Sequence, residues 1–311
     1  MLYLTGMLMK ISVDLTKHSV KDVLLNKEPW LQKASSTILL YLDAFFGVVM
    51  WVGGFNVLYL IPGGTYWYSL TSIFFIASII LMLIKAFHCS GGVPLALGMD
   101  EFENVFNPSN YFNTKFECNH CFKVILDTFF TYSVVHTLVI CCWWSMWELE
   151  NRFIFYPCEI TVKDIKAWDS VIFSYFLVFL VVHFNNSVQS MKEEDGKLSK
   201  VAANNLMAFL AFLASLNFWR GIWSLMDFYF FPSMNLWENL LLSHVTGFLG
   251  TLLTGTSLTL TQRSGRDSAT TEFIDFSYRS KSGGWGGRRS QYEDLDQQST
   301  EQVEGLVMEP A

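Results

Sequence analysis

Long apolar stretches separated by short polar segments dominate the first 260 residues of the chain. A helix needs about 20 mainly apolar residues to cross the hydrocarbon core of a bilayer. In lipid, backbone N–H and C=O groups must be bonded within the segment, and this requirement favours helices. The pattern predicts an all-α membrane protein, a polytopic bundle of about six spans over residues 37–61, 67–87, 124–147, 167–184, 205–231 and 237–260.

The segments on either side of these spans differ in character. Residues 1–36 are expected to form a cytosolic or interfacial N-terminal segment, because Lys10 and Asp14 interrupt a weakly apolar start. The alternative is that residues 1–15 end a further span. Residues 37–260 are expected to form the transmembrane bundle. Residues 261–311 are rich in Ser, Thr, Gly, Gln and acidic residues, a composition that predicts a disordered cytosolic tail.

Composition supports the membrane assignment. Hydrophobic residues make up 51% of the chain and charged residues 16%, whereas a soluble domain carries about 25% charged residues. The net charge of −7 comes largely from loops and tail, so we expect no nucleic-acid partner. The lipid bilayer is the first expected partner.

Basic residues predict the orientation, since cytosolic loops carry an excess of Lys and Arg. Of the 21 basic residues, 17 fall on one side of the six-span scheme and three on the other, and Arg220 lies inside a span. This count assigns Lys10 and Lys17 to the cytosolic N-terminal segment. It predicts a plasma-membrane protein with both termini in the cytosol.

Aromatic residues and prolines suggest an internal repeat. Each candidate unit is a helical hairpin with an aromatic pair four residues apart, then a proline, then a tryptophan that opens the second helix. The alternative is that Trp and Pro mark the outer interface of any membrane protein. The units would be parallel repeats, marked by Trp51, Phe55, Pro62 and Trp67, by Trp143, Trp147, Pro157 and Trp168, and by Trp219, Trp223, Pro232 and Trp237.

Charged residues inside predicted spans are candidates for function, because each costs about 2.5–3.5 kcal/mol on insertion scales. The sequence suggests a polar cluster under the outer interface, with Arg220 paired to Glu148 or Asp227 as the first expectation. The alternative is a structural ion pair that fixes helix register. Asp43 and Asp127 lie near inner span ends and are weaker candidates. The full candidate cluster is Arg220, Asp227, Glu148, Glu150 and Glu238.

The loop after the second span offers weak metal-ligand candidates, namely His88, Cys89, Cys118 and Cys121. Four such ligands can bind zinc, but a single Cys-x-x-Cys is a weak signal, and ordinary reduced or palmitoylated cysteines are the alternative. No metal or other cofactor is therefore expected. The sequence contains no P-loop, nucleotide-binding fingerprint, nucleophile elbow or metalloprotease motif, so an enzyme is the least favoured class.

Three sequence blocks resemble one known family. They are WWSMWELENR at residues 143–152, AWD at 167–169 and NFWRGIWSLMD at 217–227. These blocks are similar to the Fuseless family of animal multi-pass membrane proteins, and the resemblance covers about residues 37–260. The resemblance implies an eight-pass architecture, a presynaptic plasma-membrane location and a role in neurotransmission. It further implies voltage-gated calcium channels or other presynaptic membrane proteins as partners.

Two functions follow from these observations. The first is a neuronal membrane protein that supports synaptic transmission by organising or modulating presynaptic calcium channels and vesicle fusion. The second is a transporter or channel with a polar site around Arg220, Asp227 and Glu148. The first predicts a sealed contact around the Arg220 guanidinium, and the second predicts a polar path lined by these groups.

Overall fold

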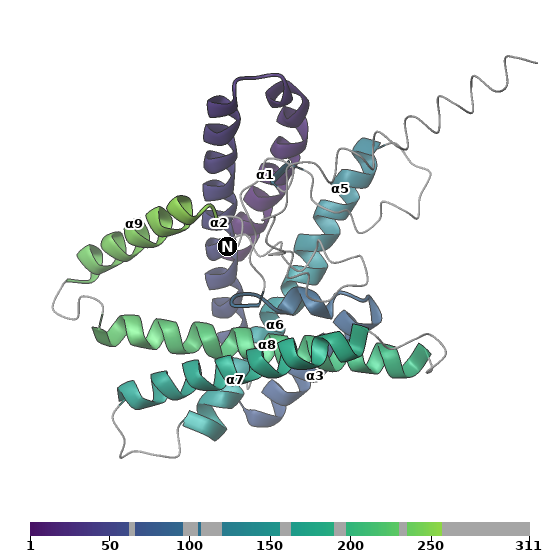
Figure 1. Cartoon of the computed structure of the whole chain (residues 1–311), viewed down its shortest axis with the longest axis vertical. Helices are drawn as coiled ribbons and strands as arrows, with labels where there is room; N and C mark the ends of the chain where they lie inside the picture. The colour runs from purple at the N-terminus through teal and green to yellow at the C-terminus, as the bar shows by residue number, and fades with distance from the viewer. Residues whose placement is uncertain are drawn as a thin grey trace, which may run out of the picture. The chain divides into compact units, whose positions relative to one another are not determined.

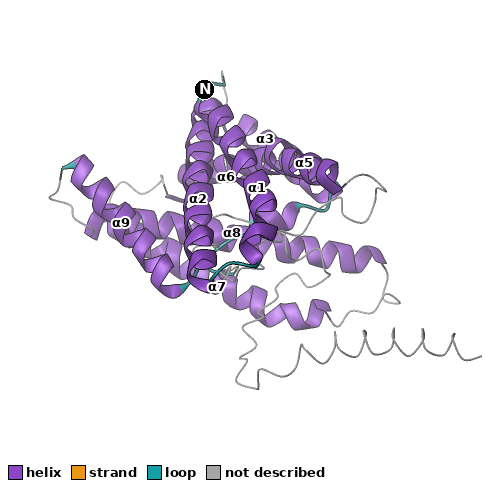
Figure 2. Ribbon diagram, turned by 90° about the horizontal axis from the view of Figure 1, so that it is seen from above, coloured by secondary structure: helices purple, strands orange, loops and turns teal. Residues whose placement is uncertain are grey.

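The structure is a computed structural model, and it describes residues 1–61, 66–95, 105–106, 120–155, 163–189, 197–229 and 235–256. The chain divides into two units, Met1–Ile274 and Asp275–Ala311, and every described residue belongs to the first. All regular elements among the described residues are helices (Figures 1 and 2). The predicted all-α class is confirmed. The predicted tail lies outside the described residues.

Each predicted span corresponds to a helix. The third span is one continuous helical stretch in which two π-helical segments, η2 and η3, flank α6. In chain order the elements are α1 (Leu2–Leu25), α2 (Pro29–Tyr59), α3 (Trp67–Leu83), η1 (Phe87–Ser90), α5 (His120–Phe130), η2 (Thr131–Val135), α6 (His136–Glu150), η3 (Asn151–Phe155), α7 (Lys163–Gln189), α8 (Lys197–Tyr229) and α9 (Leu236–Thr254).

Four stretches are long and apolar enough to cross a membrane: Pro29–Tyr59, Ile125–Phe153, Lys166–Asn185 and Ser199–Tyr229. A fifth, α3, is equally apolar but has only 17 residues. Large apolar side chains such as Phe75 and Ile76 on α3, and Ile172 and Phe176 on α7, are exposed. Lipid is the solvent in which such surfaces are stable, so the chain is a polytopic membrane protein.

Helix pairing differs from the hairpins suggested by the repeat. The most extensive contacts join α1 with α2, α3 with α6, and α7 with α8. In the six-span scheme the connections within these pairs fall on the cytosolic side, whereas the expected hairpins turn on the outer side. Among the described residues α9 lies largely apart from the other helices, and Tyr41 of α2 reaches it through a hydrogen bond to His244 and an edge contact with Phe248.

The N-terminal segment is a helix with a buried face. Gln32 near the start of α2 donates hydrogen bonds to the carbonyls of Leu24 and Leu25, which close the turn between α1 and α2. The two helices run side by side from this turn (Figures 1 and 2). Lys10, which was expected to face the cytosol, is fully buried. A neutral set of buried partners explains this position, as described below.

A short segment after α3 folds back into the bundle. The chain reverses at Lys85, which adopts a left-handed backbone (φ 57°), and η1 then packs against α8 and α6. The indole N–H of Trp143 donates to the carbonyl of Ser90 at 2.9 Å, and the N–H of Gly92 donates to the Ser215 hydroxyl at 2.8 Å. Side chains of the bundle thus satisfy polar backbone atoms of this irregular segment.

Candidate functional site

The most extensive buried ionic network lies between α1 and α2. Lys10, Asp14 and Lys17 follow one another at spacings of four and three residues. These spacings place the side chains on one face of α1, because residues three or four apart are neighbours on a helix. That face meets Asp43 of α2, and all four residues are at most 2% exposed. We call Lys10, Asp14, Lys17, Asp43 and Tyr132 the α1–α2 cluster.

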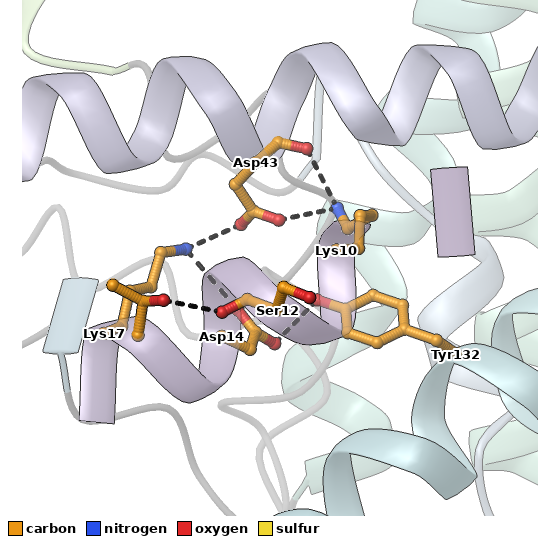
Figure 3. A network of polar contacts seen from close by, with 7 residues as sticks. Lys10, Ser12, Asp14, Lys17, Asp43 and Tyr132 are labelled. Carbon is orange, nitrogen blue, oxygen red and sulfur yellow. Dashed lines mark hydrogen bonds and ion pairs between the residues drawn. The ribbon is translucent and has the colours of Figure 1, made fainter. Parts of the chain in front are cut away.

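Asp43 is the centre of this cluster (Figure 3). Its Oδ1 lies 3.0 Å from Nζ of Lys10, and its Oδ2 lies 2.7 Å from Nζ of Lys17. The Lys10 ammonium also donates to the Asp43 backbone carbonyl at 3.3 Å. Lys17 in turn lies 3.6 Å from Oδ1 of Asp14. Two ammonium groups and two carboxylates therefore neutralise one another away from water.

The third membrane helix completes the cluster through Tyr132. Its hydroxyl donates to Oδ2 of Asp14 at 2.7 Å, and its ring lies 5.3 Å from the Lys10 ammonium. Tyr132 belongs to the π-helical segment η2, and such segments occur frequently at functional sites. The neighbouring His136 is buried against Tyr132 and Trp51. Three helices of the bundle thus meet at one neutral polar centre.

A second buried ion pair joins the C-terminal parts of α6 and α8. Arg220 Nη1 lies 3.5 Å from Oε2 of Glu150, and Arg220 Nη2 donates to the Trp147 carbonyl at 2.7 Å. The guanidinium also lies 4.6 Å from the centre of the Trp147 ring. Asn217, one turn earlier on α8, donates to Oε1 of Glu150 at 3.0 Å. We call Arg220, Glu150, Asn217 and Trp147 the Arg220 cluster.

The three other residues of the expected cluster are less buried than Glu150. Glu148 is half-buried and accepts a hydrogen bond from the Tyr59 hydroxyl. Asp227 is exposed, and Glu238 is exposed at the start of α9, where its N–H is capped by Asn235. Among the described residues, the salt bridge found for Arg220 is therefore the one with Glu150. Glu150 follows Trp147 by three residues, almost one helical turn, so both residues can contact the Arg220 guanidinium from the same side of α6.

The weak metal candidates can be followed only in part. His88 and Cys89 lie on η1, where Cys89 Sγ is 3.6 Å from Nε2 of His88. Cys118 and the side chain of Cys121 lie outside the described residues. Among the side chains that the structure describes, no three His, Cys, Asp or Glu residues are grouped as metal ligands.

Sequence reasoning missed Lys10, Asp14 and Lys17 as members of a buried site and ranked Asp43 as a weak candidate. The signal was available in the spacing of the three α1 residues, which places both signs of charge on one helical face. It was masked by the low apolarity of α1, which makes the helix look like a solvated segment. The partner, Asp43, lies 26 residues from the nearest of the three and could not be assigned by spacing.

Comparison with known families decides the identity of the chain. The Fuseless family matches residues 1–260. The chain belongs to the Fuseless family. The match begins at residue 1, so the Fuseless region contains α1 as well as the six predicted spans. No curated protein and no solved structure is significantly similar to the chain.

Proposed function

We propose that this Fuseless protein supports synaptic transmission by organising or modulating voltage-gated calcium channels, and thereby vesicle fusion, in the presynaptic plasma membrane. The family match over residues 1–260 is the basis for a neuronal membrane role. One observation favours a channel-organising protein over a transporter. It is the sealed contact around the Arg220 guanidinium.

A transport site requires a charged group that can meet a substrate or an ion. Arg220 is instead occupied by the carboxylate of Glu150, the carbonyl of Trp147 and the Trp147 ring. Its side chain is 6% exposed and that of Glu150 is 2% exposed. Asp227, which the transport hypothesis requires beside Arg220, is on the surface. These contacts favour a structural role for the pair, and with it a protein that acts through partners.

The proposal includes an orientation. The C-terminal tail and the turn between α1 and α2 lie in the cytosol, because basic residues such as Lys27, Lys33, Arg263 and Arg266 flank the adjoining helices. A cytosolic tail would be available to partners at the inner face of the membrane.

The experiment that tests the function uses neurons that lack this protein. Presynaptic calcium entry and evoked release are recorded in these neurons with and without re-expression of the full chain. We expect both signals to fall without the protein and to recover with it. An Asp227→Asn chain should restore both signals fully, because the side chain is exposed and outside the buried pair.

Normal calcium entry and normal evoked release in the absence of the protein would contradict the proposal. The transporter alternative is examined separately with purified protein in proteoliposomes. Flux of an ion or small solute that is lost in Arg220→Ala would favour that alternative.

A further inference from the structure

Three tryptophans from two helices form a continuous group beside the Arg220 pair. The ring centres of Trp147 and Trp223 lie 5.6 Å apart with their planes at 50°. Those of Trp219 and Trp223 lie 6.1 Å apart with their planes at 60°. Trp219 and Trp223 are one turn apart on α8, and Trp147 meets Trp223 from α6. We call Trp147, Trp219 and Trp223 the tryptophan group.

The tryptophan group already holds one cation. The Arg220 guanidinium lies 4.6 Å from the centre of the Trp147 ring, within the range of about 6 Å over which a cation is attracted to an aromatic face. This attraction arises because the face of the ring carries negative potential, and indole is the strongest of the three aromatic side chains in this respect. The same kind of surface is repeated in the two neighbouring rings.

Trp223 is the member of the group that a ligand can reach. Its side chain is 52% exposed, whereas Trp147 and Trp219 are half-buried. Contacts with both of these rings hold Trp223 in position. A second cation can therefore approach the exposed part of the Trp223 ring without displacing the Arg220 guanidinium from Trp147.

The charges beside the tryptophan group favour a cation. Glu150 and Glu148 both act electrostatically on Arg220. Glu150 forms the buried salt bridge with it, whereas Glu148, which directly follows Trp147, accepts a hydrogen bond from the uncharged Tyr59 hydroxyl. Two carboxylates beside one guanidinium leave an excess of one negative charge at this place.

The tryptophan group lies toward the end of two membrane spans. Trp147 is six residues before the end of Ile125–Phe153, and Trp223 is six residues before the end of Ser199–Tyr229. These stretches have 29 and 31 residues, more than the about 20 that the hydrocarbon core requires. Because tryptophan concentrates at the interface between membrane and water, the group is placed where lipid headgroups lie.

We propose that the tryptophan group binds a quaternary ammonium group of the choline class, with Trp223 as its platform and Glu148 as the nearby negative charge. A trimethylammonium group has no N–H to donate, so aromatic faces recognise it through its charge. Choline lipids present this group at the membrane surface, and free choline carries it in water. The proposal does not depend on the proposed synaptic role.

The test uses the full chain, isotope-labelled at its indole nitrogens, in nanodiscs of phosphatidylglycerol, a lipid without a quaternary ammonium group. The indole N–H resonance of Trp223 is assigned by its loss in Trp223→Phe. We expect choline chloride to shift this resonance in a saturable manner. Trp30 is the control, because it is 69% exposed at the start of α2 and outside the tryptophan group. Sodium chloride at equal concentration controls for ionic strength.

A second set of nanodiscs identifies the source of the ligand. If a lipid headgroup occupies the site, phosphatidylcholine should shift the Trp223 resonance more than that of Trp30 without added choline. A response to free choline alone would assign the site to soluble quaternary ammonium compounds, and either response supports the proposal. No shift of Trp223 in either arm, or shifts of Trp30 and Trp223 of the same size, would overturn it.

A neutral ligand separates charge from shape. The analogue of choline in which carbon replaces the nitrogen has the same outline without the charge, so we expect at most a small shift of Trp223. A shift equal to that produced by choline, from this analogue or from sodium chloride, would show that no quaternary ammonium is recognised and would overturn the proposal.

Glu148→Gln tests the contribution of the carboxylate. We expect the choline concentration that gives half of the full shift to rise at least several-fold. Glu28→Gln is the matched control, because Glu28 is exposed before α2 and should leave this concentration unchanged. The indole resonance of the buried Trp144 reports whether each variant keeps its fold. Equal concentrations for the two folded variants would contradict the role assigned to Glu148.

Discussion

The backbones of α1 and α2 touch where Gly53 faces Tyr3. A Cβ atom added to Gly53 would lie 2.3 Å from the Tyr3 N and 2.7 Å from its Cα. Small residues allow helices in membranes to approach this closely, and association there depends on packing because lipid gives no hydrophobic driving force between helices. The close approach also brings the short Asp43 side chain within reach of Lys10 and Lys17.

Replacement of Gly53 by alanine should therefore separate the two helices. The clash is with backbone, which cannot move aside alone, so we expect a loss of about 1–3 kcal/mol of stability, as for other overpacked sites. Thermal unfolding of the detergent-solubilised protein measures the change. Gly247→Ala on α9 is the control, since nothing lies within 4 Å of a Cβ there. Equal stability of the two variants would show that the Gly53 contact is not tight.

Loss of the Tyr132 hydroxyl should weaken the α1–α2 cluster. Tyr132→Phe removes the hydrogen bond to Oδ2 of Asp14 and leaves a buried carboxylate oxygen without that donor. The expected cost is about 1–3 kcal/mol, measured by chemical unfolding in micelles. Tyr175→Phe on α7 should change little, because Tyr175 is 55% exposed. A Tyr132→Phe protein as stable as the control would mean that Asp14 does not depend on the third helix.

Truncation of Arg220 should destabilise the contact between α6 and α8. Arg220→Ala leaves Glu150 as a buried charge with only Asn217 as its remaining described partner, and such losses cost about 3–5 kcal/mol. Arg220→Lys should recover part of this, because an ammonium keeps the charge but not the planar stacking on Trp147.

Asp227→Asn, on the same helix but exposed, should stay within about 0.5 kcal/mol of the unmodified protein. The thermal midpoints of the three variants give the comparison. A midpoint of Arg220→Ala equal to that of Asp227→Asn would show that the ion pair contributes nothing to stability.

Trp143 should hold the η1 segment in place. Trp143→Phe keeps a ring of similar shape but removes the donor to the Ser90 carbonyl at 2.9 Å. We expect about 1–3 kcal/mol of destabilisation and faster hydrogen exchange at the amides of residues 87–92. Trp168→Phe is the control, because Trp168 is 50% exposed on α7. Unchanged exchange in that segment would contradict an anchoring role for the indole.

The spans were predictable because apolar length is a local property. The run around Leu40 and Met50 predicts α2, and Trp147 and Arg220 mark the region where the second ion pair forms. The partner of Arg220 was not predictable to the residue, because Glu148 and Glu150 lie on different faces of α6 and only packing selects between them. The pairing of α1 with α2 was missed because Lys10 and Lys17 make α1 resemble a polar segment.

The sequence by itself determined the helical class, the positions of the apolar spans and the family, since each depends on residues close together along the chain. The tertiary structure decided which helices pair, where η1 folds back, and which charges meet. The physical reason is that a buried charge is stable only beside its counter-charge, and the counter-charge of Lys10 and Lys17 is on another helix. Burial of the Lys10 side chain at Asp43 is therefore a property of the packed bundle.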